Sequence, residues 1–415
     1  MTISQGVMLV TLVIMITGRT PLYLTAILGS AAAAFAAGFP VSGKGEVTLV
    51  KLITAGLNPV IIDMLGVLLF IGIMEKAGFL DVIIKKIMQV GQRLGGGPGV
   101  ATAGGIAAGI IGGLTSFTQP AVTAAITGPA STKLGLDPNK SAGIHAHAAH
   151  LGNLAGFTHP TMLAVLATTG ITFGFINIVG AISALAIFAA SCYRASRDGR
   201  QQEISMDLIN QLSDLQVDNI AFLKAVIPFV LLFIGFGAGL PIFLVGILCC
   251  VTVAILARMS LADGEKFMMA GVTRISTPLF AIITFLFMSA VINKIGLVDL
   301  LSKQFAPYLT LAPIQILLVI SAVTGLVTQS NAASAAIVIP VLQIILNLGA
   351  SPFAAAAAAM AGCAIMQFYL TGGPLTALPT VIPVIPGSDL KLANKFQRPS
   401  ILVGLLTAFV LTFVI

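Results

Sequence analysis

Long runs of apolar residues follow one another along almost the whole chain. They lie near residues 4–17, 21–38, 56–76, 174–193, 221–238, 241–257, 276–293 and 400–415. About 20 apolar residues are needed for an α-helix to cross the hydrocarbon core of a bilayer. The pattern therefore predicts an all-α polytopic membrane protein. An outer-membrane β-barrel would show shorter segments in which apolar and polar residues alternate.

Two apolar stretches, 97–134 and 311–347, are interrupted by polar residues near their middle. The polar residues are Ser116, Thr118 and Gln119 in the first stretch and Gln329, Ser330 and Asn331 in the second. The arms on either side are too short to span a bilayer comfortably. We therefore expect two re-entrant hairpins, each with a polar tip.

Two further segments, 140–171 and 353–385, are predicted to be helices that unwind near the middle. Glycine, proline and polar residues gather at 152–161 and 371–376. The polar positions and glycine of interest are Asn153, His159, Thr161, Thr371, Gly373 and Thr376. Unwound backbone at membrane depth is tolerated only where it lines a cavity or is buried in protein.

The order of these segments repeats. Each half has three spans, an amphipathic piece, a hairpin, a broken helix and a final span, and residues 75–85 match 293–303 at Lys, Gly, Asp and Lys. We expect repeats at 1–193 and 219–415, joined by the polar linker 194–218. Five crossings per half is an odd number, so the second repeat is inverted. The predicted fold has 10 transmembrane helices plus two re-entrant hairpins.

Composition and charge agree with this topology. The chain is 57% hydrophobic and 8% charged, whereas soluble domains carry about 25% charged residues. If the N-terminus is outside, seventeen of the 21 Lys and Arg residues face the cytoplasm, as the positive-inside rule requires. The net charge of +7 is then topogenic and does not indicate nucleic-acid binding. We expect an inner-membrane protein with both termini outside.

The tips and breaks are the expected site. Helix N-termini attract anions, while free carbonyls and hydroxyls coordinate cations. The candidates for substrate binding are Thr118, Gln119, Asn153, His159, Thr161, Ser330, Asn331, Thr371, Gly373 and Thr376. The candidates for binding the coupling ion, H⁺ or Na⁺, are Ser116, Thr118, Gln329, Ser330, Asn331, His159 and Asp63. The alternative is that small polar residues merely let helices pack closely.

Ionisable residues inside apolar segments add further candidates. The four histidines, His145, His147, His150 and His159, lie within fifteen residues. His159, beside Pro160 at the predicted break, is the best candidate for anion contact or proton coupling. The other three have open roles, either in packing or as metal ligands. Asp63 is the one carboxylate well inside a predicted span, with a role in coupling or in a scaffold hydrogen bond.

The tip motifs resemble those of the ion transporter superfamily, which includes divalent anion/sodium symporters and citrate and gluconate permease-like families. The symporters carry Ser-Asn-Thr at the tips; here the second tip has Ser330-Asn331-Ala332, and Thr118-Gln119-Pro120 departs from the motif. The resemblance implies a homodimer with a scaffold domain and a transport domain that moves like an elevator.

Together these features predict a secondary active transporter of a small organic anion, coupled to H⁺ or Na⁺ by alternating access. No enzyme activity and no cofactor other than Na⁺ is expected, and the four cysteines lack metal-ligand spacing. No nucleotide-binding P-loop is present. The alternatives are a Na⁺/H⁺ antiporter, an intramembrane metalloenzyme that uses the histidines, and a channel.

Overall fold

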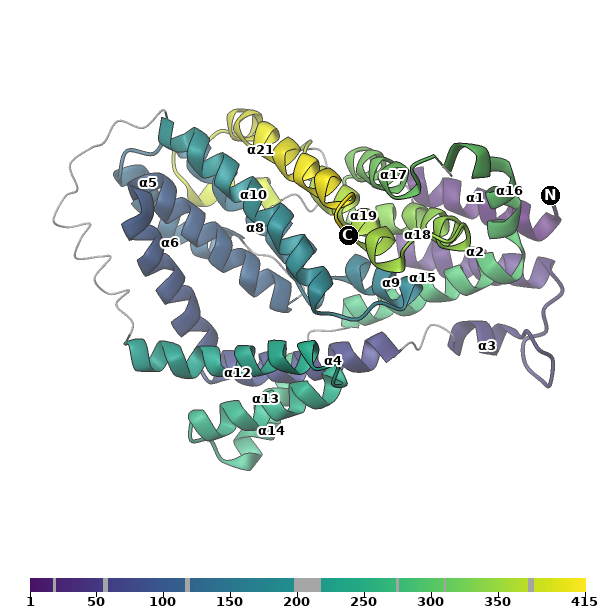
Figure 1. Cartoon of the computed structure of the whole chain (residues 1–415), viewed down its shortest axis with the longest axis horizontal. Coiled ribbons are helices and arrows are strands. Elements are labelled where there is room, and N and C mark those ends of the chain that lie inside the picture. The colour runs from purple at the N-terminus through teal and green to yellow at the C-terminus, as the bar shows by residue number, and fades with distance from the viewer. Residues whose placement is uncertain are drawn as a thin grey trace.

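The structure is a computed structural model that describes residues 1–17, 20–54, 59–115, 120–197, 218–273, 276–309, 311–371 and 377–415. Every regular element in these ranges is a helix (Figure 1). The first half contains α1 (Ile3–Thr17), α2 (Leu22–Ala36), α3 (Leu49–Thr54), α4 (Pro59–Lys76), α5 (Phe79–Thr115), α6 (Pro120–Lys133), α7 (Pro138–Ala146), α8 (Ala148–Ala155), α9 (Pro160–Thr169) and α10 (Phe175–Arg197). The second half contains α12 (Asn219–Gly237), α13 (Ile242–Leu256), α14 (Leu261–Val272), α15 (Ser276–Lys294), α16 (Leu297–Leu309), α17 (Pro313–Thr328), α18 (Asn331–Asn347), α19 (Pro352–Met366), α20 (Ala377–Val381), the 3₁₀ helix η2 (Ile382–Val384) and α21 (Leu390–Leu411).

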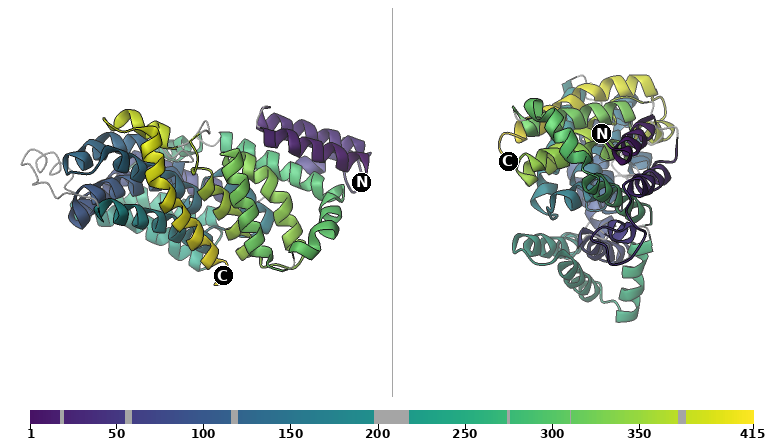
Figure 2. Two further views of the ribbon diagram at one scale, coloured as in Figure 1. Left: turned by 90° about the horizontal axis from the view of Figure 1, so that it is seen from above. Right: turned by 90° about the vertical axis from the view of Figure 1, so that its right-hand side faces the viewer.

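The two halves exchange helices. α4 of the first half packs against α13 and α14 of the second, and α15 of the second packs against α2 and α3 of the first. In Figure 1 the group of α4, α13 and α14 lies at the bottom of the view, and the group of α2, α3 and α15 lies at the right; Figure 2 gives two further views. Glycines allow the closest approach, because a Cβ on Gly66 would meet the backbone of Phe243, and one on Gly72 would meet the backbone of Gly271. Each half therefore completes the packing of the other.

The predicted tips coincide with ends of helices. α17 ends at Thr328 and α18 begins at Asn331, and α5 ends at Thr115 where α6 begins at Pro120. The first tip itself, residues 116–119, lies outside the described residues. In the first half the amphipathic piece is continuous with the hairpin arm in α5, which contains Gly96 with φ +59° and Pro98.

The broken segments also contain helix ends. α8 ends at Ala155 and α9 begins at Pro160, since proline lacks the N–H group that the first turn of a helix leaves unpaired. A second irregularity separates α7 from α8 at His147. In the second half α19 ends at Met366, and residues 372–376 lie outside the described residues.

Two stretches in the described residues are long and apolar enough to cross a membrane, Gly96–Leu114 and Phe175–Arg197, and eight shorter apolar helical segments have 10–17 residues. Gly96–Leu114 is a hairpin arm that we expected to be too short. The final helix, predicted at 400–415, begins at Leu390 because Asp389 caps it, accepting hydrogen bonds from Lys391 N and Leu392 N. Most of the predicted linker, 198–217, lies outside the described residues.

The hairpins connect the halves in a crossed manner. The first arm of each hairpin packs on the broken helix of its own half, α5 on α8 and α17 on α19. The second arm packs on the broken segments of both halves, α18 on α19 and α9, and α6 on α7 and α20. The tip of the second hairpin thereby reaches the break of the first half.

Candidate functional site

The crossed packing joins two of the predicted site residues. Asn331 at the start of α18 and His159 at the start of α9 lie 172 positions apart, yet their side chains meet, with Nδ2 of Asn331 3.1 Å from Nε2 of His159. Asn331 is 8% exposed. The contact is polar, and it lies between helices that are mainly apolar.

Two helix N-termini meet at this contact. His159 is the residue before the first turn of α9 and Asn331 is the first residue of α18. The unpaired N–H groups at such ends favour negative charge. With Asn331 Nδ2 as the donor, His159 Nε2 accepts, and a neutral ring then carries its proton on Nδ1. That proton is available to a further acceptor.

Four buried polar atoms around these ends have no hydrogen-bond partner in the described part of the chain. They are His159 Nδ1, Thr161 Oγ1, Gln329 Oε1 and Asn331 Oδ1. The first two can donate a hydrogen bond, and the amide oxygens can only accept one. Buried polar groups in native proteins are almost always paired, so each unpaired one requires an explanation. A ligand with hydrogen-bond acceptors would satisfy the two donors. Donors on the same ligand, or a cation bound with it, would satisfy the two amide oxygens.

The tip of the second hairpin has a specific backbone conformation. Gln329 adopts the left-handed conformation, φ 49° and ψ 29°, and its N–H donates to Gly325 O over 2.9 Å to end α17. Ser330 then caps α18 by accepting from Ala333 N at 3.4 Å. A non-glycine residue costs about 1–2 kcal/mol in this conformation. The turn therefore holds an amide side chain where glycine would be the least strained choice.

The break of the first half is tied to the first hairpin and to α10. Gly113 O, near the end of α5, accepts from Phe157 N at 2.8 Å and from Thr158 Oγ1 at 3.1 Å. Asn177 of α10 donates through Nδ2 to Ala155 O and Gly156 O, both at 3.0 Å. Asn177 was not among the predicted site residues, although an Asn within an apolar span was a signal for it.

A similar arrangement holds the second break. Gln397 Nε2 of α21 donates to Phe368 O at 3.0 Å, and Arg398 Nε donates to Tyr369 O at 3.3 Å. The Arg398 guanidinium also lies 5.3 Å from the centre of the Tyr369 ring. These two residues were likewise missed, because we placed the start of α21 ten residues too late.

The other predicted residues are placed as follows. Ser116, Thr118, Gln119, Gly373 and Thr376 lie outside the described residues. Asn153 is half-buried in α8, one turn before the break, and Thr371 is half-buried after α19. Ser330 belongs to the second tip, as its cap shows. The structure thus brings His159, Thr161, Gln329, Ser330 and Asn331 to one pair of helix ends.

Asp63 has a structural partner. Its Oδ1 accepts from Phe243 N at 3.3 Å, in the first turn of α13. A carboxylate at a helix N-terminus is stabilised by the unpaired N–H groups there. This observation supports the scaffold hydrogen bond over the coupling role that we left open for Asp63.

Two of the other three histidines bridge neighbouring helices. His145 Nε2 lies 2.6 Å from Thr127 Oγ1 of α6, and its Nδ1 lies 2.8 Å from Ser141 O. His147 Nε2 lies 2.6 Å from Ser191 Oγ of α10. His150 packs edge-on against Phe368, with ring centres 4.9 Å apart. In the described ranges no three His, Cys, Asp or Glu residues are grouped so that they could hold a metal ion.

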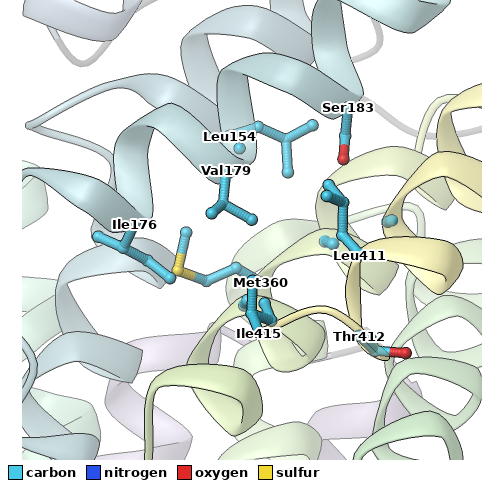
Figure 3. A pocket seen from close by; sticks show the side chains of 12 residues that line it. Leu154, Ile176, Val179, Ser183, Met360, Leu411, Thr412 and Ile415 are labelled. Carbon is cyan, nitrogen blue, oxygen red and sulfur yellow. The ribbon is translucent and has the colours of Figure 1, made fainter.

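A small enclosed cavity lies elsewhere, among α8, α10, α19 and α21 (Figure 3). Leu154, Val179, Met360 and Leu411 point into it, and Ser183 lies at its edge. Its volume of about 10 Å³ is close to the minimum for a single water molecule. It is too small to be a substrate site.

Comparison with known proteins identifies the fold. No protein-family model matches the chain, and no curated protein sequence matches it. Among solved structures, the Alcanivorax borkumensis YdaH transporter is similar, with a TM-score of 0.60, 18% identity, and coverage of 88% of this chain and 86% of that one. Neisseria gonorrhoeae MtrF, described as illuminating a class of antimetabolite efflux pumps, has a TM-score of 0.61 at 14% identity, covering 99% of this chain and 94% of its own.

These similarities support only the coarser part of the resemblance drawn from the tip motifs. Both neighbours are transporters, so the chain has the fold of a multi-pass membrane transporter. The descriptions of these two structures name no superfamily, so the ion transporter superfamily stays a prediction from the Ser-Asn motif. The motif was two residues long and matched at only one tip, which is too little sequence to identify a superfamily.

Proposed function

We propose that the protein is a secondary active transporter that moves a small organic anion across the inner membrane, coupled to H⁺ or Na⁺. The observation that carries the proposal is the hydrogen bond between Asn331 and His159. It joins the tip of one half to the break of the other at the N-termini of two helices. Sites of this kind, between two repeats and at interrupted helices, are typical of secondary transporters.

The chemistry of the site fits a carboxylate. Among the described residues His159 Nδ1–H and the Thr161 hydroxyl are donors without partners, and the helix ends add N–H groups and a positive potential. A carboxylate has two oxygens that can accept several hydrogen bonds. The unpaired oxygens of Gln329 and Asn331 would accept from a substrate hydroxyl group or coordinate the coupling cation.

Transport would proceed by alternating access. The hairpins would move together with the broken helices that they contact, and the exchanged helices around α4 and α15 would form a fixed scaffold in an elevator-type homodimer. Similarity to two transporter folds supports a transport role in general. The direction of transport is left open, because one of these neighbours is described as an efflux pump.

The test begins with ligand identification. Purified protein is screened by thermal shift against organic acids with and without Na⁺, because a ligand of the native state raises its melting temperature. Uptake of the best ligand into proteoliposomes is then measured for wild type and Asn331→Ala. This variant removes the Asn331 oxygen proposed to bind a substrate hydroxyl or the cation, and it leaves His159 Nε2 without its donor. An unsatisfied buried group costs about 1–3 kcal/mol, so ligand affinity should fall about 10–100-fold.

The control is Gln315→Ala, at the other end of the same hairpin, where Gln315 Nε2 lies 3.1 Å from Thr412 Oγ1. It should keep uptake near that of wild type. Full uptake by Asn331→Ala would remove the site. If His159→Gln leaves the pH profile of transport unchanged, His159 has no coupling role.

A Na⁺/H⁺ antiporter is the second candidate, and the unpaired amide oxygens of Gln329 and Asn331 favour it. Such oxygens are hard ligands that suit Na⁺. An antiporter would release protons from acidified vesicles when Na⁺ is added, without any organic anion. A pH-sensitive dye in the vesicles distinguishes the two functions.

A further inference from the structure

Two apolar cavities lie one after the other between α5 and α12, apart from the His159–Asn331 contact. The first has a volume of about 320 Å³, and the second about 310 Å³. The first is lined by Lys86, Thr102, Ala103, Ile106 and Phe222, among others. The second is lined by Gly109, Ile110, Gly113, Val226 and Phe229, among others. We call the two together the α5–α12 groove.

The sequence explains why the groove exists. Gly99, Ala103, Ile106, Ile110 and Gly113 recur at intervals of three or four and lie on one face of α5. Small side chains on this face leave space opposite the aromatic rings of α12. A cavity of about 150 Å³ lined by apolar side chains is already enough to bind benzene. Each of these cavities is about twice as large, so the groove suits hydrocarbon.

A cation lies at one end of the groove. Lys86 lines the first cavity, its Nζ donates to Asn219 Oδ1 at 2.9 Å, and it lies 5.8 Å from the centre of the Phe222 ring. Both of these partners in the described residues are neutral. Thr102 Oγ1, in the same cavity, is buried and has no hydrogen-bond partner in the described part of the chain.

The surroundings of the groove are those of a bilayer interface. The start of α5 carries Lys85 and Lys86 on an amphipathic segment, a pattern typical of a helix that lies at the headgroups. The adjacent face of α12 exposes Leu223, Val230 and Ile234, as a helix facing acyl chains would. Anionic lipids attract basic segments at such an interface.

We propose that the α5–α12 groove binds an anionic phospholipid. Its acyl chain fills the two cavities, its phosphate pairs with Lys86, and the Thr102 hydroxyl donates to an ester carbonyl. The argument rests on the cavities, the cation and the unpaired hydroxyl, and it holds whether or not the transported substrate is an organic anion.

The protein contains its own probe for this site. Cys192 lines the first cavity and is partly exposed, while Cys249, Cys250 and Cys363 are buried. N-ethylmaleimide labelling of delipidated protein in neutral detergent should therefore occur at Cys192, and Cys192→Ser should abolish it. Adding phosphatidylglycerol should slow the labelling severalfold, and phosphatidylcholine at the same concentration should slow it much less.

Variants test the headgroup contact. Lys86→Gln should label at the wild-type rate without lipid but lose the difference between the two lipids. Lys133→Gln, which changes an exposed lysine at the end of α6, should keep that difference. Melting curves show whether each variant is folded. Equal protection by both lipids in wild type, or an unchanged difference in Lys86→Gln, would overturn the proposal. Protection by an organic acid and by neither lipid would assign the groove to substrate instead.

Discussion

The two broken segments can be compared directly. In the first half, Asn177 of α10 donates to the carbonyls of Ala155 and Gly156, which end α8. In the second half, Gln397 and Arg398 of α21 donate to the carbonyls of Phe368 and Tyr369, just after α19. In both halves the last long helix, α10 or α21, donates to the carbonyls that the break leaves free.

The difference lies in charge. A neutral amide holds the first break, and the polar residue that this break presents to the opposite tip is a histidine, whose charge can change. A guanidinium helps to hold the second break, and its positive charge is permanent. Repetition of a fold therefore does not imply repetition of its chemistry. The first break can therefore change its charge when His159 binds or releases a proton. The second break keeps the constant positive charge of Arg398.

The largest expected effect is on the first break. Asn177→Leu leaves two carbonyls and Gly174 N without their partner, and each buried unsatisfied group costs about 1–3 kcal/mol. For three such groups we expect a loss of stability of at least about 3 kcal/mol, measured by denaturant unfolding in detergent. Ser183→Ala, on the same helix at the edge of the small cavity, is the control and should change stability little. Equal losses for both variants would mean that Asn177 does not hold the break.

The second break should be less sensitive to a single substitution. Gln397→Leu removes one donor to Phe368 O, and Arg398 remains bonded to the next carbonyl. We expect a loss of about 1–2 kcal/mol, about one unsatisfied carbonyl, in the same unfolding experiment. A loss larger than that of Asn177→Leu would reverse the comparison.

The contact between the halves should show a measurable coupling energy. In a double-mutant cycle with His159→Ala and Asn331→Ala, we expect the two effects on stability to be non-additive by about 1 kcal/mol. The reason is that each substitution removes the same hydrogen bond. Strictly additive effects would show that the tip and the break are energetically independent.

The smallest effect on stability should come from Asp63, which lies at the N-terminus of α13 and outside both breaks. Asp63→Asn retains an oxygen that can accept from Phe243 N and loses only the charge at the start of α13. That charge is worth about 0.3–1 kcal/mol. Melting temperature should fall slightly, and transport should continue. Abolished transport with unchanged melting would instead assign Asp63 to ion coupling.

Much of the helical pattern could be predicted from apolar runs and from proline. The ends of α8, α9, α17 and α18 lie where polar residues interrupt the apolar runs. The sequence identified His159 and Asn331 as candidate site residues. It did not predict that they contact each other, because that contact depends on how the two halves pack together. Inversion of the second half in the membrane remains a prediction.

Other features depend on tertiary contacts that no local pattern contains. Asn177, Gln397 and Arg398 act on carbonyls of another helix, and a polar residue in an apolar span does not reveal its partner. The exchange of α4 and α15 between halves depends on glycine pairs far apart in sequence. The motif at one tip was too short to identify a superfamily, whereas three-dimensional similarity over most of the chain identified the fold.

The exchange of helices between halves has a consequence for biogenesis. Asp63 of α4 leaves the ribosome 180 residues before Phe243, to which it is hydrogen bonded. During that interval α4 lacks α13 and α14, and the half-buried Asp63 carboxylate lacks its partner. Stable insertion of the first half must therefore wait for translation of the second. Each half made alone should be degraded, whereas the two halves made together as separate chains should assemble.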